Sequence, residues 1–316
     1  MTIDVPSVLL FFIDGLGIGS RGLFNPLDGL DEAAPLAIFQ SEEPVTIFDG
    51  VIVPTDASLG VSGRPQSASG QTTILTGVNA PGLLGYHKQG FPNVALLEII
   101  GEHSLFRQLS RIGVAPITFA NAYTQRFFDA PPRWVSATTA AVEAAGLHFR
   151  TVEDLRAGRA VYQDFTNAIL IERGEDVSAR TPEEAAEVLA SIVATNRFTL
   201  YEYFITDKIG HAQDMNAARI ILAQLARFIR SLLAKLDLER TTVILTSDHG
   251  NIEDLSTRNH TLNAVPTIIW GENRDRVAPR IRSLADITPA ILEVLTGKGT
   301  ETDGQFGRST FSQTSL

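Results

Sequence analysis

Aspartate and histidine side chains recur at the ends of apolar, strand-like runs in this sequence. Three such runs, 7–13, 199–205 and 241–245, lead into Asp14, Asp207 and Asp248. Three histidines follow the last two runs: His211, His249 and His260. Carboxylate oxygens mixed with imidazole nitrogens suit a hard-to-borderline divalent cation. This number of donors predicts two metal ions, each with a position left open for substrate.

The elements that carry these side chains can bring them together. The carboxyl ends of parallel strands meet at one edge of an open α/β sheet, where such folds bind ligands. His211 lies four residues after Asp207, so one helical turn would point both side chains the same way. Gly250 lets the chain turn sharply after His249. The alternative is a polar loop that happens to hold histidines.

A hydroxyl nucleophile is available in the stretch 60–77, GVSGRPQSASGQTTILTG. Its first half predicts a loop, and a helix could begin near Ala68. Ser67 or Ser69 would then lie at the positive end of the helix dipole, which helps to hold an alkoxide or a phosphoryl group. The alternative is ordinary N-capping by serine. Arg64 is a candidate phosphate contact, or a surface arginine.

Gly17, Gly19 and Gly22 fit the G-x-G-x-x-G pattern of dinucleotide-binding folds. That pattern must open a helix directly. Here Asn25-Pro26 and Pro35 interrupt any helix, so we expect a loop instead.

Composition narrows the functional class. The chain has 316 residues, 44% of them hydrophobic and 20% charged, which is typical of a globular protein. The net charge of −10 disfavours nonspecific nucleic-acid binding. The absence of cysteine excludes disulfides and thiolate ligands. The apolar run after Ser7 is too short to span a membrane and has no basic residues before it, so we expect a cytoplasmic protein.

The order of strand-like and helix-like segments predicts an α/β fold with a core formed by 1–122 and 181–316. Between them, the segment 123–180 lacks this alternation of strand-like and helix-like segments and is interpreted as a small insert or lid. A Gly- and Pro-rich loop after the candidate nucleophile carries His87, a candidate substrate contact. Arg126 and Arg133 could contact an anion, but arginines are mostly surface residues. About the last twenty residues are expected to be a tail.

Five motifs in order resemble the alkaline phosphatase superfamily, and within it the branch of cofactor-independent phosphoglycerate mutases and phosphopentomutases. They are IDGLG at 13–17, PQSASGQT at 65–72, TDKIGH at 206–211, SDHGNIED at 247–254, and His260 with NAVP at 263–266. The resemblance implies a mainly parallel sheet sandwiched by helices, with a small inserted cap. The short insert differs from the large substrate-holding domain of the phosphoglycerate mutases.

The resemblance also implies roles for the residues. Asp207, His211 and His260 would hold one metal ion; Asp14, Asp248 and His249 would hold the other, with the oxygen of Ser69. The family metals are zinc, manganese or magnesium. Ser69 would be the nucleophile, with Ser67 as its nearest competitor. Lys208, Arg64 and His87 are candidates for neutralising the phosphate charge.

These features predict a two-metal phosphotransfer enzyme that acts on a small phosphate ester through a phosphoserine intermediate, as a phosphomonoesterase or a phosphomutase. A metal-dependent phosphodiesterase is the alternative enzyme. A sulfatase is disfavoured, because Ser69-Gly70-Gln71 does not match the proline and arginine motif that sulfatases need. A non-catalytic metal-binding protein is the alternative from another class. No nucleic-acid or membrane partner is expected, and the sequence leaves the oligomeric state open.

Overall fold

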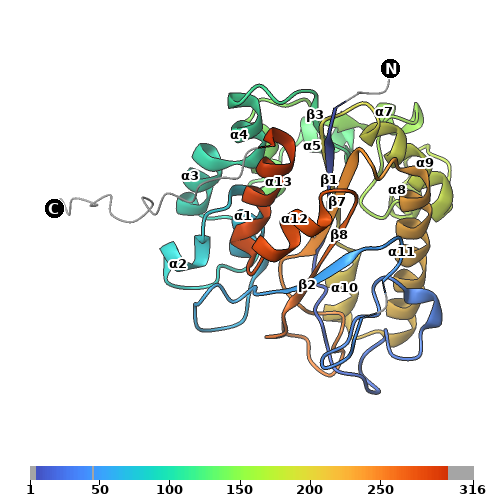
Figure 1. The fold of residues 1–316 in the computed structure, drawn as a ribbon. Helices are drawn as coiled ribbons and strands as arrows, with labels where there is room; N and C mark the ends of the chain where they lie inside the picture. Colours follow the sequence, from blue (N-terminus) through green and yellow to red (C-terminus); the bar gives the residue numbers. More distant parts are fainter. Residues whose placement is uncertain (1–4, 45, 298–316) are drawn as a thin grey trace.

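The computed structural model describes residues 5–44 and 46–297. A six-stranded sheet in the order β2-β8-β7-β1-β6-β3 forms its centre (Figure 1). The strands are β1 (Ser7–Ile13), β2 (Val51–Thr55), β3 (Ile117–Phe119), β6 (Phe198–Tyr203), β7 (Thr241–Ser247) and β8 (Val265–Trp270). Strand β1 pairs in parallel with β6 and β7, and β8 pairs antiparallel with β7 and β2. The predicted α/β class with a mainly parallel sheet is confirmed.

The apolar runs read from the sequence correspond to the central strands, whose residues are buried throughout. Burial on both faces explains why they are continuously apolar rather than alternating. Strand β2 was not predicted; it is a short edge strand that contains Pro54, and most of its residues are only partly buried.

Helices cover both faces of the sheet (Figure 1). Helices α9 (Pro182–Val193) and α11 (Met215–Lys235) pack on one face, with the 3₁₀ turn η1 (Asp31–Ala33). The other face is covered by α1 (Ser67–Thr76), α3 (Val94–His103), α4 (Leu105–Arg111), α6 (Ala137–Ala144) and α13 (Ile287–Thr296). The remaining short elements are α2 (Ala80–Leu84), β4 (Ala122–Tyr123), α5 (Gln125–Asp129), β5 (Arg150–Thr151), α7 (Val152–Arg156), α8 (Ala168–Glu172), α10 (Ile205–Ala212), α12 (Arg274–Val277), η2 (Ala278–Arg280) and η3 (Leu284–Asp286).

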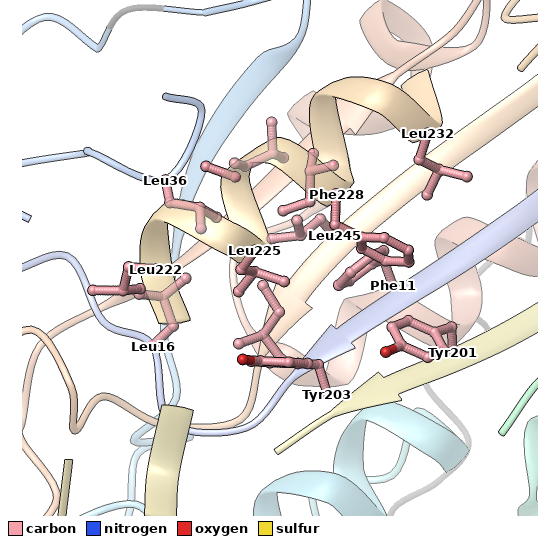
Figure 2. Close-up of a cluster of buried hydrophobic side chains, with 14 of the residues drawn as sticks. Phe11, Leu16, Leu36, Tyr201, Tyr203, Leu222, Leu225, Phe228, Leu232 and Leu245 are labelled. Atoms are coloured by element: carbon pink, nitrogen blue, oxygen red, sulfur yellow. The ribbon is translucent and has the colours of Figure 1, made fainter. Parts of the chain in front are cut away.

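Helix α11 shows how sequence pattern becomes packing. Its leucines and Phe228 recur at helical spacing and face the sheet, where Phe228 meets Phe11 of β1 with 5.7 Å between ring centroids (Figure 2). Helix α9 begins as predicted at Thr181, whose side chain accepts from the Glu184 amide while Glu184 reaches back to the amide of Thr181.

The segment 123–180 is anchored to both faces of the core. Its helix α6 joins the hydrophobic cluster beneath α1 and α4. Its Phe165 stacks on Phe228 of α11, with ring centroids 4.5 Å apart. The role of this segment as a lid stays a prediction, as do the boundaries of the insert. The predicted C-terminal tail lies outside the described residues for all but its first positions.

No helix in the described ranges combines the length and hydropathy that membrane crossing requires.

Candidate active site

Three neighbouring strands deliver the predicted aspartates to one edge of the sheet. Strand β1 lies between β6 and β7, so Ile13 is in register with both Tyr203 and Ser247. Asp14 and Asp248 follow β1 and β7 directly, and Asp207 lies in α10 just after β6. The chain after β1 approaches Asp207 closely: a Cβ built on Gly15, next to Asp14, would lie only 2.9 Å from Cβ of Asp207.

One cluster combines Asp207, His211 and His260. The two Nε2 atoms lie 3.3 Å apart, and they lie 3.3 and 3.5 Å from the Asp207 oxygens. Each histidine uses its other ring nitrogen on a backbone carbonyl: His211 Nδ1 on Arg258 O at 2.6 Å, and His260 Nδ1 on Pro65 O at 2.9 Å. Donation by Nδ1 leaves the lone pair on Nε2, which is the arrangement that metal-binding histidines adopt.

A second cluster converges on Nε2 of the fully buried His249. This atom lies 3.3 Å from Asp14 Oδ1, 3.5 Å from Asp248 Oδ2 and 2.9 Å from the hydroxyl of Ser67. The clusters adjoin one another, since the rings of His249 and His260 stack with centroids 3.6 Å apart.

The two clusters fit divalent cations. Ligand atoms about 2.0–2.1 Å from a tetrahedral metal lie about 3.3–3.4 Å from each other. The imidazole nitrogens of both clusters lie at a similar distance, 3.3–3.5 Å, from their carboxylate oxygens. Asp207 also lies close enough to Asp14 and His249 to form a second group of possible ligands with them. Asp14 Oδ1 is buried and has no hydrogen-bond partner among the described residues, although a buried carboxylate oxygen needs one. A cation would supply that partner. Nitrogen and oxygen donors without sulfur are compatible with zinc or manganese.

Burial and mutual repulsion perturb the pKa values of these groups strongly. Burial, together with the charge of Asp207, raises the pKa of Asp248 to about 8, and burial with the charge of Asp248 raises that of Asp14. Burial lowers the pKa of His249 to about 3. Burial alone would raise the pKa of Asp207, but the hydrogen bond with His260 and the nearby imidazoles have a larger effect and lower this pKa to about 2. Excess negative charge at this edge favours cation binding.

The structure does not bring Ser69 to either cluster. Ser69 is 0% exposed, and its hydroxyl donates to Gln66 O at 3.3 Å and accepts from the Lys88 amide at 3.1 Å. Ser67, the first residue of α1, takes that place beside His249. Its hydroxyl does not cap the helix, because the N-cap position is Gln66. Ser67 therefore replaces Ser69 as the candidate nucleophile and metal-contacting hydroxyl.

Gln71 is a site residue that the sequence reasoning missed. Its Nε2 donates to Asp14 Oδ2 at 3.1 Å and to Asp248 Oδ2 at 3.2 Å. Because it lies one helical turn after Ser67, both side chains share a face of α1, and this spacing was the available signal. Gln71 thus fixes the two carboxylates relative to the helix that carries Ser67.

Glu253 was also missed, although it lies within the SDHGNIED motif. Its buried carboxylate accepts from the amides of Gly17 and Asn251 at 2.9 and 2.7 Å, and from the Thr261 hydroxyl at 2.5 Å. It therefore ties together the loops that follow Asp14, Asp248 and His260. Gly250 is required here for space rather than for an unusual backbone angle: its Cβ would lie 2.2 Å from Glu253 Oε1.

A cavity of about 520 Å³ opens beside the clusters and is lined by Asp14, Ser67, Asp207 and Lys208, among others. Its volume is that of a small-molecule site. Arg64 and His87 do not line this cavity, and His87 Nε2 lies 3.2 Å from the carbonyl of Val61 instead. Arg126 and Arg133 do not line it either. The glycines after β1 form a loop, as expected, and no helix opens there.

Comparison with known proteins finds metalloenzymes among similar sequences. The family model described as Metalloenzyme superfamily matches residues 156–298, which include Asp207, His211, Asp248, His249 and His260. The 2,3-bisphosphoglycerate-independent phosphoglycerate mutase of Trichodesmium erythraeum is 24% identical over 283 residues, covering 80% of this chain and 49% of the relative. That of Antithamnion sp. is 33% identical over 129 residues, covering 36% of this chain and 25% of the relative. The alignments thus span between a quarter and a half of these relatives.

Solved structures extend the likeness in fold. A Bacteroides thetaiotaomicron protein of glycosaminoglycan metabolism matches 92% of this chain and 73% of its own, with 14% identity and a TM-score of 0.51. The alkaline phosphatase of the Antarctic bacterium TAB5 matches 92% of this chain and 98% of its own, with 14% identity and a TM-score of 0.49. The resemblance to metalloenzymes of the alkaline phosphatase superfamily, on the side of the phosphoglycerate mutases, is confirmed by the family model and the relatives.

Proposed function

We propose that this protein is a two-metal phosphotransfer enzyme in which Ser67 accepts the phosphoryl group of a small phosphate ester. The observation that carries the proposal is the position of the Ser67 hydroxyl, 2.9 Å from His249 Nε2 and at the start of α1. It opens onto the cavity shared with Asp14 and Asp207. A serine beside a divalent-cation site and at the positive end of a helix is suited to act as an alkoxide.

The residues of the site would have different roles in this reaction. Asp207, His211 and His260 would hold one cation, and Asp14, Asp248 and His249 the other. When bound, these cations would lower the pKa of the serine hydroxyl and neutralise charge on the phosphoryl oxygens. Gln71 orients the two carboxylates, and the exposed Lys208 offers a positive charge at the cavity.

The reaction would proceed by in-line displacement. The hydroxyl of Ser67 gives its proton to solvent water, and its Oγ forms a bond to phosphorus while the ester P–O bond breaks. The departing oxygen takes a proton from water. The phosphoserine is then attacked by water in a phosphomonoesterase, or by a hydroxyl of the bound molecule in a phosphomutase. The names of the relatives favour a mutase, whereas the short 123–180 segment differs from the large inserted domain of that family.

The experiment that tests this proposal is turnover of a chromogenic phosphate monoester and diester by metal-stripped protein, before and after addition of Mn²⁺ or Zn²⁺. We expect monoester turnover that depends on the metal, and phosphate on the Ser67 peptide after rapid quenching. Ser62→Ala, in the exposed loop before α1, is the matched control and should keep full turnover.

Diester turnover alone would instead identify a phosphodiesterase. Metal binding without turnover of either ester, and without conversion of any sugar phosphate, would contradict the proposal and favour a non-catalytic metal-binding protein.

A further inference from the structure

The cavity beside the metal clusters has a second polar feature, Glu202 of β6. Its neighbours on the cavity wall include the aromatic rings of Phe119, Tyr123 and Phe127. The rings of Tyr123 and Phe127 lie 4.6 Å apart, and those of Phe119 and Tyr123 lie 6.1 Å apart. A ligand held at the clusters therefore has an aromatic wall and a carboxyl group within the same cavity.

Glu202 is held in place by its backbone. The side-chain amide of Asn121 donates to Glu202 O at 2.7 Å and its oxygen accepts from Glu202 N at 3.0 Å. Glu202 also pairs in register with Phe12 of β1, in the centre of the sheet. The backbone of Glu202 is thus fixed by the fold before any ligand arrives, which limits the positions that its carboxyl group can take.

The carboxyl group of Glu202 is in an unusual environment. The residue is 8% exposed, and none of the ion pairs within 5–44 and 46–297 includes it. Burial raises its pKa to about 7, and the nearby hydroxyl of Thr138 acts in the opposite direction. A buried carboxyl without a cationic partner is costly, and strand stability gives no reason to keep one in a run of apolar residues. A ligand in the cavity that hydrogen-bonds to this group would add a partner to the hydroxyl of Thr138.

Three other hydroxyl groups on the wall, those of Tyr123, Thr139 and Ser136, are hydrogen-bonded among themselves. Tyr123 Oη lies 2.8 Å from Thr139 Oγ1, which lies 3.0 Å from Ser136 Oγ. The carboxyl of Glu202 can both donate and accept when protonated, and can accept twice when ionised. Either form suits an alcohol.

We propose that Glu202 is a specificity-determining residue that hydrogen-bonds a hydroxyl on the non-phosphate part of the substrate, so that the substrate is a phosphorylated sugar or polyol. The proposal rests on the proposed function, because it places the phosphate at the metal clusters. Lys208 and Arg173, which line the same cavity, favour this class over a substrate that carries an ammonium group, since two cations would repel it.

Binding rather than turnover tests this proposal, so that its failure can be told apart from failure of the proposed function. Metal-loaded Ser67→Ala protein, with its metal content checked, is titrated calorimetrically with inorganic phosphate, ribose 5-phosphate, glycerol 3-phosphate and phosphoethanolamine. Thermal shifts of the wild-type protein with the same ligands repeat the ranking with the serine in place. We expect at least one polyol phosphate to bind tenfold or more tightly than inorganic phosphate.

Glu202 is then changed in the same background. Glu202→Leu should weaken binding of the polyol phosphate, relative to binding of inorganic phosphate, by at least tenfold. Glu202→Gln, which keeps a donor and an acceptor, should weaken it less. Glu98→Leu, an exposed carboxylate on α3, is the matched control and should leave the affinities as they are.

Two results would overturn the proposal. One is that no polyol phosphate binds better than inorganic phosphate, or that the advantage survives Glu202→Leu. The other is that phosphoethanolamine is the tight ligand and loses its advantage equally in the Leu and Gln variants, which would identify an ammonium-binding carboxylate.

Discussion

The hydroxyl of Ser67 lies 2.9 Å from Nε2 of His249, which joins the first residue of helix α1 to the end of strand β7. This contact requires the helix to approach the strand end closely. Gly70 allows it, because a Cβ there would lie 3.0 Å from the carbonyl oxygen of Asp248. The candidate nucleophile and a candidate metal ligand, 182 positions apart in sequence, therefore lie in contact because Gly70 leaves room for the helix.

Replacement of Ser67 or Ser69 by alanine should affect different properties, turnover in the first case and stability in the second. Ser67→Ala is expected to abolish metal-dependent monoester turnover, by at least about 10³-fold, because no other hydroxyl replaces the nucleophile. Ser69→Ala should keep turnover but lower the free energy of unfolding by about 1–3 kcal/mol, since it leaves the Lys88 amide without its acceptor. Steady-state kinetics and urea unfolding check both. Loss of turnover in Ser69→Ala alone would return the nucleophile to position 69.

The number of bound metal ions should equal the number of intact clusters. Wild-type protein dialysed against Mn²⁺ or Zn²⁺ is expected to hold about two ions per chain. His260→Ala should hold about one, because it lacks one of the three donors of the cluster formed by Asp207, His211 and His260. Elemental analysis by mass spectrometry measures the ratio. His148→Ala, an exposed histidine, is the control. An unchanged content in His260→Ala would exclude this residue as a ligand.

The stability of the metal-free protein should fall as pH rises above about 6.5. Between its ordinary pKa of 3.8 and its folded pKa of about 8, Asp248 binds more protons in the folded than in the unfolded protein, so stability decreases with pH. The raised pKa values of Asp14 and His260 likewise make the folded protein less stable as pH rises. His249, lowered from 6.5 to about 3, acts in the opposite direction, but only below pH 6.5.

The measurement is the melting temperature in EDTA from pH 6.5 to 8, compared with Mn²⁺-loaded protein. Metal should reduce the fall, because it stabilises the ionised carboxylates. A melting temperature that rises with pH in EDTA would show that the carboxylates are ionised without metal.

Glu253 should control metal affinity without touching the metal. Glu253→Gln replaces one acceptor oxygen by an NH₂ group that faces N–H or O–H donors, which disturbs the loops on both sides of the site. We expect metal affinity to fall by about 10–100-fold, as for other residues that orient ligands. Calorimetric metal titration measures it, with the exposed Glu239→Gln as control. An affinity equal to that of the control would reduce Glu253 to a packing role.

Much of the fold and of the metal clusters could be predicted from local sequence. The central strands were visible because burial on both faces makes them continuously apolar. The aspartates that end them had to meet once those strands were parallel, and the helical spacing of Asp207 and His211 is found in α10. The antiparallel pairing of β8 could not be predicted, because it depends on which partner edge is free.

The choice of Ser67 over Ser69 as the candidate nucleophile depends on tertiary structure. Ser67 and Ser69 have the same side chain and lie two residues apart, about 200° around a helix, so they face opposite ways. Only the docking of α1 on β7 shows that Ser67 faces the metal clusters and Ser69 the Lys88 loop. The surroundings of Glu202 and Glu253 could not be predicted for the same reason, because they come from strands and loops distant in sequence. The sequence by itself determined which donors exist and at which strand ends, while the packing of helices and loops on the sheet decided which side chains share a site.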